Sequence, residues 1–169
     1  DIVTNSLAAR RCIGYLPEGA PAYGEMTTRH FLAFIARARG FSGDGVKRVS
    51  GQAMERLNLQ SVAEQPIETL SKGFKRRVGL AQAILHDPEV LILDEPTDGL
   101  DPNQKHEVRA LIREMSADKI IVISTHVLEE VHALCNRAMI IADGRLLVDD
   151  SPKGLLKRSR YHNAVTMVV

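Results

Sequence analysis

Two adjacent carboxylates follow an apolar run near the middle of the chain. The run Val90-Leu91-Ile92-Leu93 leads into Asp94, Glu95 and Pro96. A short, branched apolar run predicts a strand covered on both faces, as in the centre of a parallel α/β sheet. Because the residue before a proline favours extended backbone, we expect Glu95 to continue the strand and both acids to lie at its carboxyl end, where such sheets bind ligands. Such a pair suits a divalent cation and an activated water; alternatively, Asp94 is a helix cap and Glu95 a surface acid.

Four cations gather at the start of a predicted helix. They are Lys72, Lys75, Arg76 and Arg77. Positive charge in the first turns opposes the helix macrodipole, at about 0.3 to 1 kcal/mol for each exposed charge. Ser71 is a suitable N-cap, and with Gly73 and the free N–H groups it makes a helix start that suits phosphate. An anion there would offset the repulsion; alternatively, the cations extend into solvent or meet acids elsewhere in the fold.

The remaining pattern alternates strands and helices. Strands are predicted at 12–16, 90–95, 120–124 and 138–142, the last turning through Asp143-Gly144 into 145–148 as a hairpin. Helices are predicted from a Thr27 or Thr28 cap to Gly40, through 46–59, from Ser71 to 85, from Asp101-Pro102 to about 117, over 127–134, and after Ser151-Pro152. Residues 1–5 have the pattern of a strand end entering a turn, and 161–169 that of a last strand or a frayed tail. This alternation predicts a three-layer, parallel α/β domain.

Composition sets limits on function. The 169 residues suit one domain with a real core. Lys and Arg number 22 and Asp and Glu 21, a net charge of +1 that gives no global sign of a nucleic-acid or acidic partner. The two cysteines, Cys12 and Cys135, stand in or beside apolar stretches and are interpreted as buried free thiols in a reducing compartment. No apolar run reaches the ~18 to 20 residues of a membrane span, and no signal peptide opens the sequence.

Four motifs in register resemble a known family. Leu70-Ser71-Lys72-Gly73-Phe74, the strand ending in Asp94-Glu95, Gly99-Leu100-Asp101 and Ser124-Thr125-His126 are similar in order and spacing to the signature loop, Walker B strand, D-loop and switch histidine of the nucleotide-binding subunit of an ABC transporter. Tyr15-Leu16-Pro17-Glu18 at the lid-loop position most resembles the bacterial exporter and gliding-motility branch. The resemblance implies a P-loop-NTPase-like core with a helical arm: 1–17 start the core sheet, 18–69 form the arm and lid loop, 70–158 form the catalytic core, and 159–169 are a C-terminal tail.

The resemblance implies ATP hydrolysis that drives substrate transport, with ATP and Mg²⁺ as cofactors. Asp94 would hold Mg²⁺, through water, and Glu95 would orient or deprotonate the attacking water. His126 would contact the γ-phosphate, although a lone histidine is more often structural. Glu18 stands where the family usually has glutamine, which links Mg²⁺ and water to the membrane partner. A carboxylate can bind Mg²⁺ but donates no hydrogen bond unless it is protonated.

The resemblance also implies two protein partners. Ser71, Lys72, Gly73 and Phe74 would serve the ATP of a second nucleotide-binding subunit in a head-to-tail dimer, with Lys72 and Phe74 in place of the usual glycine and glutamine. Asp101 would be a helix cap and a cross-dimer contact, or a cap alone. A transmembrane permease subunit would dock on 28–59 and 19–26, where Tyr23, Met26 and Phe31 are candidates that could equally be core. We expect a cytoplasmic protein, peripheral on the inner face of the cell membrane.

No Gly-x-x-x-x-Gly-Lys-Ser/Thr string occurs in these residues, and the cluster Gly40 to Gly45 fails the spacing. We therefore expect a chain truncated at its N-terminus, without the Walker A loop, that does not hydrolyse ATP alone although the intact subunit does. An exposed apolar sheet edge should then favour association. Two alternatives are a nucleic-acid-associated ATPase and a non-catalytic regulatory module. Because no zinc or coiled-coil module accompanies the motifs, no nucleic-acid partner is expected.

Overall fold

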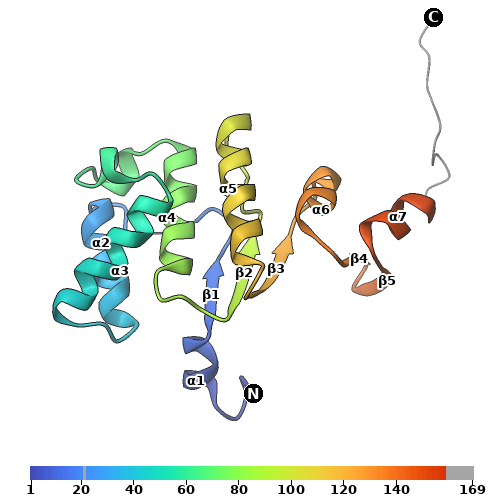
Figure 1. The fold of residues 1–169 in the computed structure, drawn as a ribbon, viewed down its shortest axis with the longest axis horizontal. Coiled ribbons are helices and arrows are strands. Elements are labelled where there is room, and N and C mark those ends of the chain that lie inside the picture. The colour runs from blue at the N-terminus through green and yellow to red at the C-terminus, as the bar shows by residue number, and fades with distance from the viewer. Residues whose placement is uncertain (21, 159–169) are drawn as a thin grey trace, which may run out of the picture. The chain divides into compact units, whose positions relative to one another are not determined.

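The structure, a computed structural model, describes residues 1–20 and 22–158 (Figure 1). The predicted tail over 159–169 and Pro21 of the predicted lid loop lie outside the described residues. The chain divides into two compact units, Asp1–Ser124 and Thr125–Val169, which are described separately. The α/β class is confirmed. None of the described helices is long and apolar enough to cross a membrane.

Three parallel strands form the sheet of the first unit. They are β1 (Ile13–Leu16), β2 (Val90–Asp94) and β3 (Ile120–Ser124), with β2 in the middle. In the register, Leu16 pairs with Leu93 and Asp94 pairs with Ser124. The predicted central strand with the acid pair at its carboxyl end is therefore confirmed.

Helix α4 (Lys72–Ile84) packs closely on β1, and each of the two elements has a glycine at the contact. A Cβ on Gly79 would lie 2.6 Å from the Ala20 Cβ and 2.8 Å from Leu16 Cδ1, and one on Gly14 would collide with the carbonyl oxygen of Ala83. This contact forms the centre of the core. The apolar residues of α4, β1 and β2 with 0% exposure are Leu16, Val78, Leu80, Ala81, Ala83, Leu91 and Leu93.

The other helices of the first unit are α1 (Ser6–Arg11), α2 (Thr28–Ala38), α3 (Gly43–Arg56) and α5 (Pro102–Met115). Helices α2 and α3 pack on each other and on α4, on the side of α4 away from the sheet (Figure 1). Thr27 caps α2 as predicted: its side chain accepts a hydrogen bond from the backbone N–H of His30. Short 3-10 turns at Gln60–Val62 and Ile67–Thr69 connect this arm to α4.

The outer face of the sheet differs from the prediction. Side chains alternate across a strand, so the neighbours of the buried leucines point the other way. Tyr15 is 48% exposed, Ile92 37% and Val122 53%, so the prediction that β2 and β3 are covered on both faces is wrong for the described residues. The exposed apolar surface is thus a face of the sheet as well as an edge.

Two smaller predictions also fail. Residues 1–5 form a turn that leads into α1 and not the end of a strand, because the backbone N–H of Asn5 donates to the Asp1 carbonyl. Cys12 is exposed, not buried, since it lies between α1 and β1. Cys135 is partly buried, and both thiols are free.

The second unit contains α6 (Leu128–Leu134), β4 (Ala138–Ala142), β5 (Arg145–Asp150) and α7 (Pro152–Arg158). Strands β4 and β5 form the predicted antiparallel hairpin, and Asp143 (φ 50°) and Gly144 (φ 70°) have the positive φ angles of a two-residue hairpin turn. The backbone N–H of Gly154 donates to Ser151 Oγ, which confirms Ser151 as the cap of α7.

Candidate functional site

Asp94, the last residue of β2, is held by the neighbouring strand. Its Oδ1 accepts a hydrogen bond from Ser124 Oγ at 2.5 Å. The sequence pattern named Ser124 only as a member of a motif, and the parallel register is what places it opposite Asp94. One carboxylate oxygen of Asp94 is therefore oriented by Ser124, and Oδ2 is the oxygen left for another ligand.

Glu95 does not continue the strand, contrary to the prediction. Its φ is +46°, in the left-handed region that non-glycine residues adopt at a cost of about 1–3 kcal/mol. The backbone on both sides holds it there: its N–H donates to the Ser124 carbonyl at 3.0 Å, and its carbonyl accepts from the N–H of Asp98 at 3.0 Å. The chain thus turns at Glu95, and tertiary contacts override the extended preference before Pro96.

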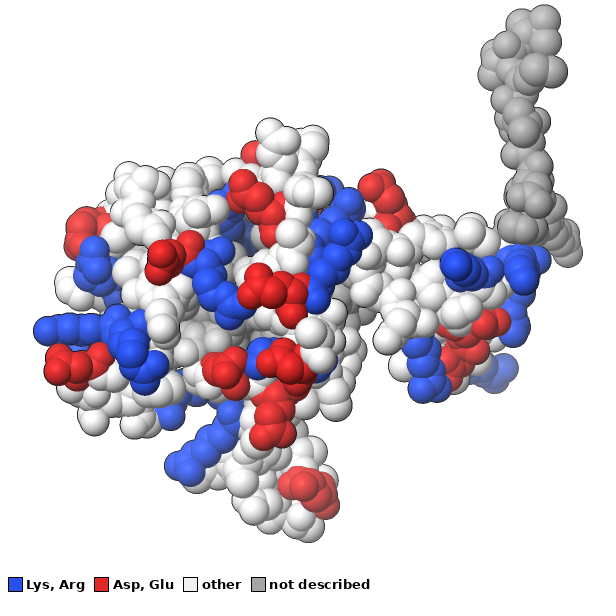
Figure 2. Space-filling view, in the orientation of Figure 1, with Lys and Arg blue, Asp and Glu red and all other residues white. Residues whose placement is uncertain are grey.

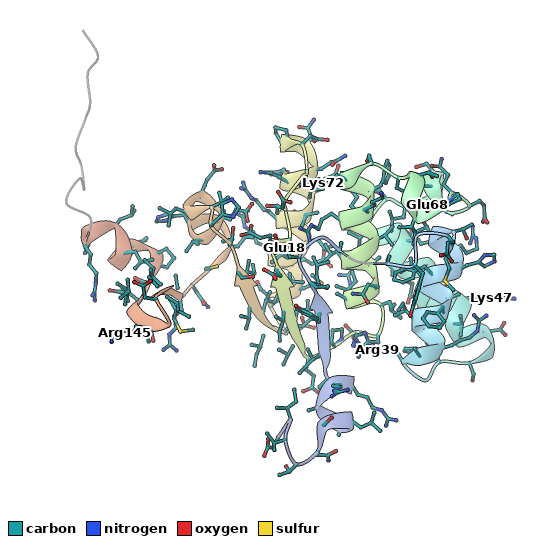
Figure 3. The ribbon with its side chains drawn as sticks, turned by 180° about the vertical axis from the view of Figure 1, so that it is seen from behind. Glu18, Arg39, Lys47, Glu68, Lys72 and Arg145 are labelled. Carbon is teal, nitrogen blue, oxygen red and sulfur yellow. The ribbon has the colours of Figure 1, made fainter. Side chains whose placement is uncertain are left out.

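Glu18 lies just beyond the carboxyl end of the adjacent strand, β1. It follows Pro17 directly after β1 and is exposed. Because Leu16 pairs with Leu93, Glu18 and Glu95 both follow the carboxyl ends of neighbouring parallel strands. Figure 3 shows Glu18 and Lys72 at the end to which the strands point.

Ser71 caps α4 as predicted. The backbone N–H of Phe74 donates to Ser71 Oγ at 3.3 Å. Gly73 packs against the start of α5: a Cβ there would lie 2.6 Å from Gln104 Oε1, at the end of a flexible side chain, and 3.5 Å from Leu100 Cδ2. Phe74 is partly buried.

The four cations at the start of α4 meet partners within the protein, which is the alternative that the sequence left open. Lys72 Nζ lies 2.9 Å from the Asp98 carboxylate. Lys75 Nζ donates to the backbone carbonyl of Glu68, and the guanidinium groups of Arg76 and Arg77 are buried. On the face shown in Figure 2, basic side chains lie beside acidic ones and form no separate basic patch. A phosphate is therefore not needed to explain these charges.

The turn after Glu95 contacts the start of α4. The hydrogen bond from Lys72 is the main reason that the pKa of Asp98 is below its usual value, and this carboxylate is therefore charged at neutral pH. Gly99 has φ +73°, and a Cβ there would lie 2.5 Å from Lys72 Cδ. The residues around Ser71 and those around Gly99 thus lie side by side.

Asp101 is the N-cap of α5. Its Oδ1 accepts a hydrogen bond from the backbone N–H of Gln104 at 2.9 Å, and Pro102 occupies the first helical turn. The cap prediction is confirmed, and the side chain is exposed.

His126 belongs to the second unit, where it is exposed just before α6. Thr125 Oγ1 accepts from the backbone N–H of Val127 at 3.1 Å and donates to Glu130 Oε2 at 3.2 Å. Glu130 is 1% exposed, so this local network anchors the start of α6. The other predicted site residues all lie in the first unit: Glu18, Ser71, Lys72, Gly73, Phe74, Asp94, Glu95 and Asp101.

The sequence also matches a known family. The profile described as ABC transporter matches residues 3–98, a range that holds β1, α4, β2 and the acid pair. This range is more than half of the chain. The chain belongs to the ABC transporter family.

Several curated members of the ABC transporter family are similar over most of the chain. The uncharacterized ABC transporter ATP-binding protein YxlF of Bacillus subtilis (strain 168) is 38% identical over 163 residues, which cover 95% of this chain and 54% of the relative. The Nod factor export ATP-binding protein I of Rhizobium sp. (strain N33) is 37% identical over 90% of this chain and 50% of its own length. The protein of that name from Burkholderia orbicola (strain AU 1054) is 35% identical, with 88% and 49% covered. The chain spans about half the length of the curated relatives it matches.

Proposed function

We propose that these residues form part of an ATP-binding subunit that hydrolyses ATP to drive transport across a membrane. The observation that carries this proposal is the acid pair at the carboxyl end of the central strand. Asp94 is oriented there by Ser124, and Glu95 is held in a left-handed turn by backbone hydrogen bonds. Strained backbone that its surroundings enforce is typical of catalytic sites. In the terms of the family, β2 is then the Walker B strand.

The Asp94 carboxylate suits Mg²⁺. This ion takes one or two protein carboxylates and completes its shell with water and substrate phosphates. Among the described residues no group of three or more His, Cys, Asp and Glu side chains could hold a metal ion by itself. Asp94 Oδ2 would hold Mg²⁺, directly or through water, and Glu18 is the carboxylate proposed as its second protein ligand. When bound, Mg²⁺ neutralises charge on the β- and γ-phosphates.

Glu95 is proposed to orient or deprotonate the water that attacks the γ-phosphate, and His126 to contact that phosphate. A positioned base contributes about 10²- to 10⁴-fold to the rate. The helix start at Ser71, Lys72, Gly73 and Phe74 would contact the ATP of a second subunit in a head-to-tail dimer. Asp101, exposed beside it, would contact that subunit as well as cap α5.

A transmembrane permease subunit is the proposed second partner, which would place the protein on the inner face of the membrane. Phe31 is 3% exposed and belongs to the core, whereas Tyr23 is 56% exposed. The Tyr23 ring contacts that of Phe34, which is 39% exposed, edge to face with centroids 5.5 Å apart. Met26 is partly buried, so Tyr23 is the most exposed of the three candidates named from the sequence and is the one proposed to contact a permease.

Hydrolysis also needs a phosphate-binding loop, and the 169 residues contain no Walker A string. We therefore propose that this chain alone does not hydrolyse ATP, and that a polypeptide which joins it to a Walker A loop does. The test is phosphate release with Mg²⁺ and ATP from both proteins. In the longer protein, Glu95→Gln should lower kcat about 100-fold or more.

Glu89→Gln is the matched control, since Glu89 is an exposed acid beside the opposite end of β2 and should leave kcat unchanged. Glu95-dependent hydrolysis by the 169-residue chain would contradict the proposed inactivity. A longer protein whose hydrolysis is insensitive to Glu95→Gln would contradict the assigned role.

A further inference from the structure

We propose that Arg76 is a positioning residue that fixes the peptide groups immediately before Glu18 and Glu95. The inference rests on the proposed function, because it concerns the acids assigned to ATP hydrolysis. Arg76 lies in the second turn of α4 and is 3% exposed. Its Nη1 donates to the carbonyl oxygen of Pro17 at 3.2 Å and to that of Asp94 at 3.4 Å. One guanidinium therefore bridges the ends of β1 and β2.

The bridge forms where the β1–β2 ladder ends. The last paired residues are Leu16 and Leu93, and Pro17 follows without an N–H group to donate. The strands no longer pair beyond this point, and partly buried carbonyls there still need hydrogen-bond donors. Arg76 donates to the carbonyls of both strand ends from α4, and the Pro17 carbonyl also accepts from the backbone N–H of Ala20 at 3.2 Å. The sequence showed this arginine only as one of four cations.

Each bridged carbonyl belongs to a peptide group whose other end is a proposed site acid. The Pro17 carbonyl lies in the peptide that joins Glu18, and the Asp94 carbonyl in the peptide that joins Glu95. A peptide group is planar, so holding its oxygen also sets the direction in which the next residue starts. This matters most at Glu95, whose positive φ needs support from its surroundings.

The same guanidinium extends to the turn after Glu95. Arg76 Nη2 lies 3.9 Å from the Asp98 carboxylate, which also binds Lys72. Three segments therefore share one buried cation: the lid-loop start at Pro17, the strand end at Asp94 and the turn at Asp98. The planar fork of an arginine can reach several acceptors at once, which a lysine ammonium does less well.

Arg77 offers a matched control on the same helix. It is 8% exposed, and it donates to the Leu57 carbonyl at 3.3 Å and to Glu107 at 3.0 Å. Its partners thus belong to the helical arm and to α5, away from the strand ends. If both buried arginines only stabilise the fold, substitution of Arg76 and of Arg77 should change kcat to a similar extent. If Arg76 positions the site acids, its substitution alone should lower kcat strongly.

The test uses the longer ATPase polypeptide with Arg76→Met, Arg76→Lys and Arg77→Met. Arg76→Met should lower kcat about 100-fold with KM for ATP changed less than about 3-fold, because a small displacement of reacting groups has effects of that size. Arg76→Lys should recover part of the loss. Arg77→Met should lower the urea midpoint and keep kcat per folded molecule within about 3-fold of the parent. Unchanged kcat in Arg76→Met, or an equal loss in Arg77→Met, would overturn the proposal.

Backbone amide exchange in the 169-residue chain separates this inference from the proposed function. Arg76→Met should speed exchange at 18–20 and 95–98 by at least about 10-fold more than at α3, and Arg77→Met should not. Equal exchange in both variants would overturn the positioning role even in an active ATPase. If no Glu95-dependent hydrolysis occurs in the longer protein, the proposed function fails while the exchange result still decides whether Arg76 holds these segments.

Discussion

The two faces of the three-stranded sheet have similar side chains and different surroundings. On the inner side, Leu16, Leu91 and Leu93 are 0% exposed. On the other side, Ile92 and Val122 are equally apolar and remain exposed. The comparison shows that the apolar residues of a strand are suited to burial, and that the packing of helices decides which of them are buried. Substitutions on the two sides should therefore differ in cost.

The largest difference is expected between adjacent residues of β2. Leu93→Ala removes a fully buried side chain and should lower the free energy of unfolding by about 2–5 kcal/mol. Ile92→Ala, on the outer face, should cost less than about half as much, because its side chain already contacts water. Urea unfolding of both variants measures the difference. Equal costs would mean that the outer face is buried in solution.

A smaller effect is expected where α4 crosses the sheet. Gly79→Ala would force a methyl group against Ala20 and Leu16 and should lower the free energy of unfolding by about 1–3 kcal/mol. Gly51→Ala in α3 is the matched change, since nothing lies within 4 Å of a Cβ there, and it should raise stability by about 0.5–1 kcal/mol. Thermal unfolding should show shifts of opposite sign, and two shifts of the same sign would contradict the close α4–β1 contact.

The smallest effect is a pH dependence of stability that arises from His86, beside the start of β1. His86 Nε2 lies 3.2 Å from the Ile13 carbonyl, and burial, helped by the nearby Arg39 charge, lowers the pKa of His86 to about 4. The unfolded chain, with a pKa near 6.5, then binds more protons between these values. Stability should be complete above pH 6.5 and fall by about 1–2 kcal/mol as the pH drops towards 4, after allowance for partial exposure.

Urea unfolding at pH 4.5 and 7.5 checks this for the parent, His86→Leu and His106→Leu, the last on the exposed side of α5. The pH-dependent loss should shrink in His86→Leu and persist in His106→Leu. A loss that is the same in all three proteins would assign the pH dependence to other groups.

The sequence by itself determined the local structure. The caps at Thr27, Ser71 and Asp101 and the Asp143-Gly144 turn follow from contacts among residues close in the chain, and they were predicted correctly. The central strand before Asp94 was predicted correctly from its apolar run. The order and spacing of the site motifs also indicated the family. Short-range preferences are strong at such places because a cap or a two-residue turn has few solutions.

Only the tertiary structure decided the left-handed turn at Glu95, the hydrogen bond from Ser124 to Asp94 and the internal partners of Arg76 and Arg77. These features join segments that are about twenty to sixty residues apart, and the sequence pattern contains no signal for such pairs. The proline rule failed at Glu95 because hydrogen bonds from β3 and from the following turn outweigh a local backbone preference. The exposure of the outer face of the sheet could not be predicted from the sequence for the same reason, because burial depends on which helices pack there.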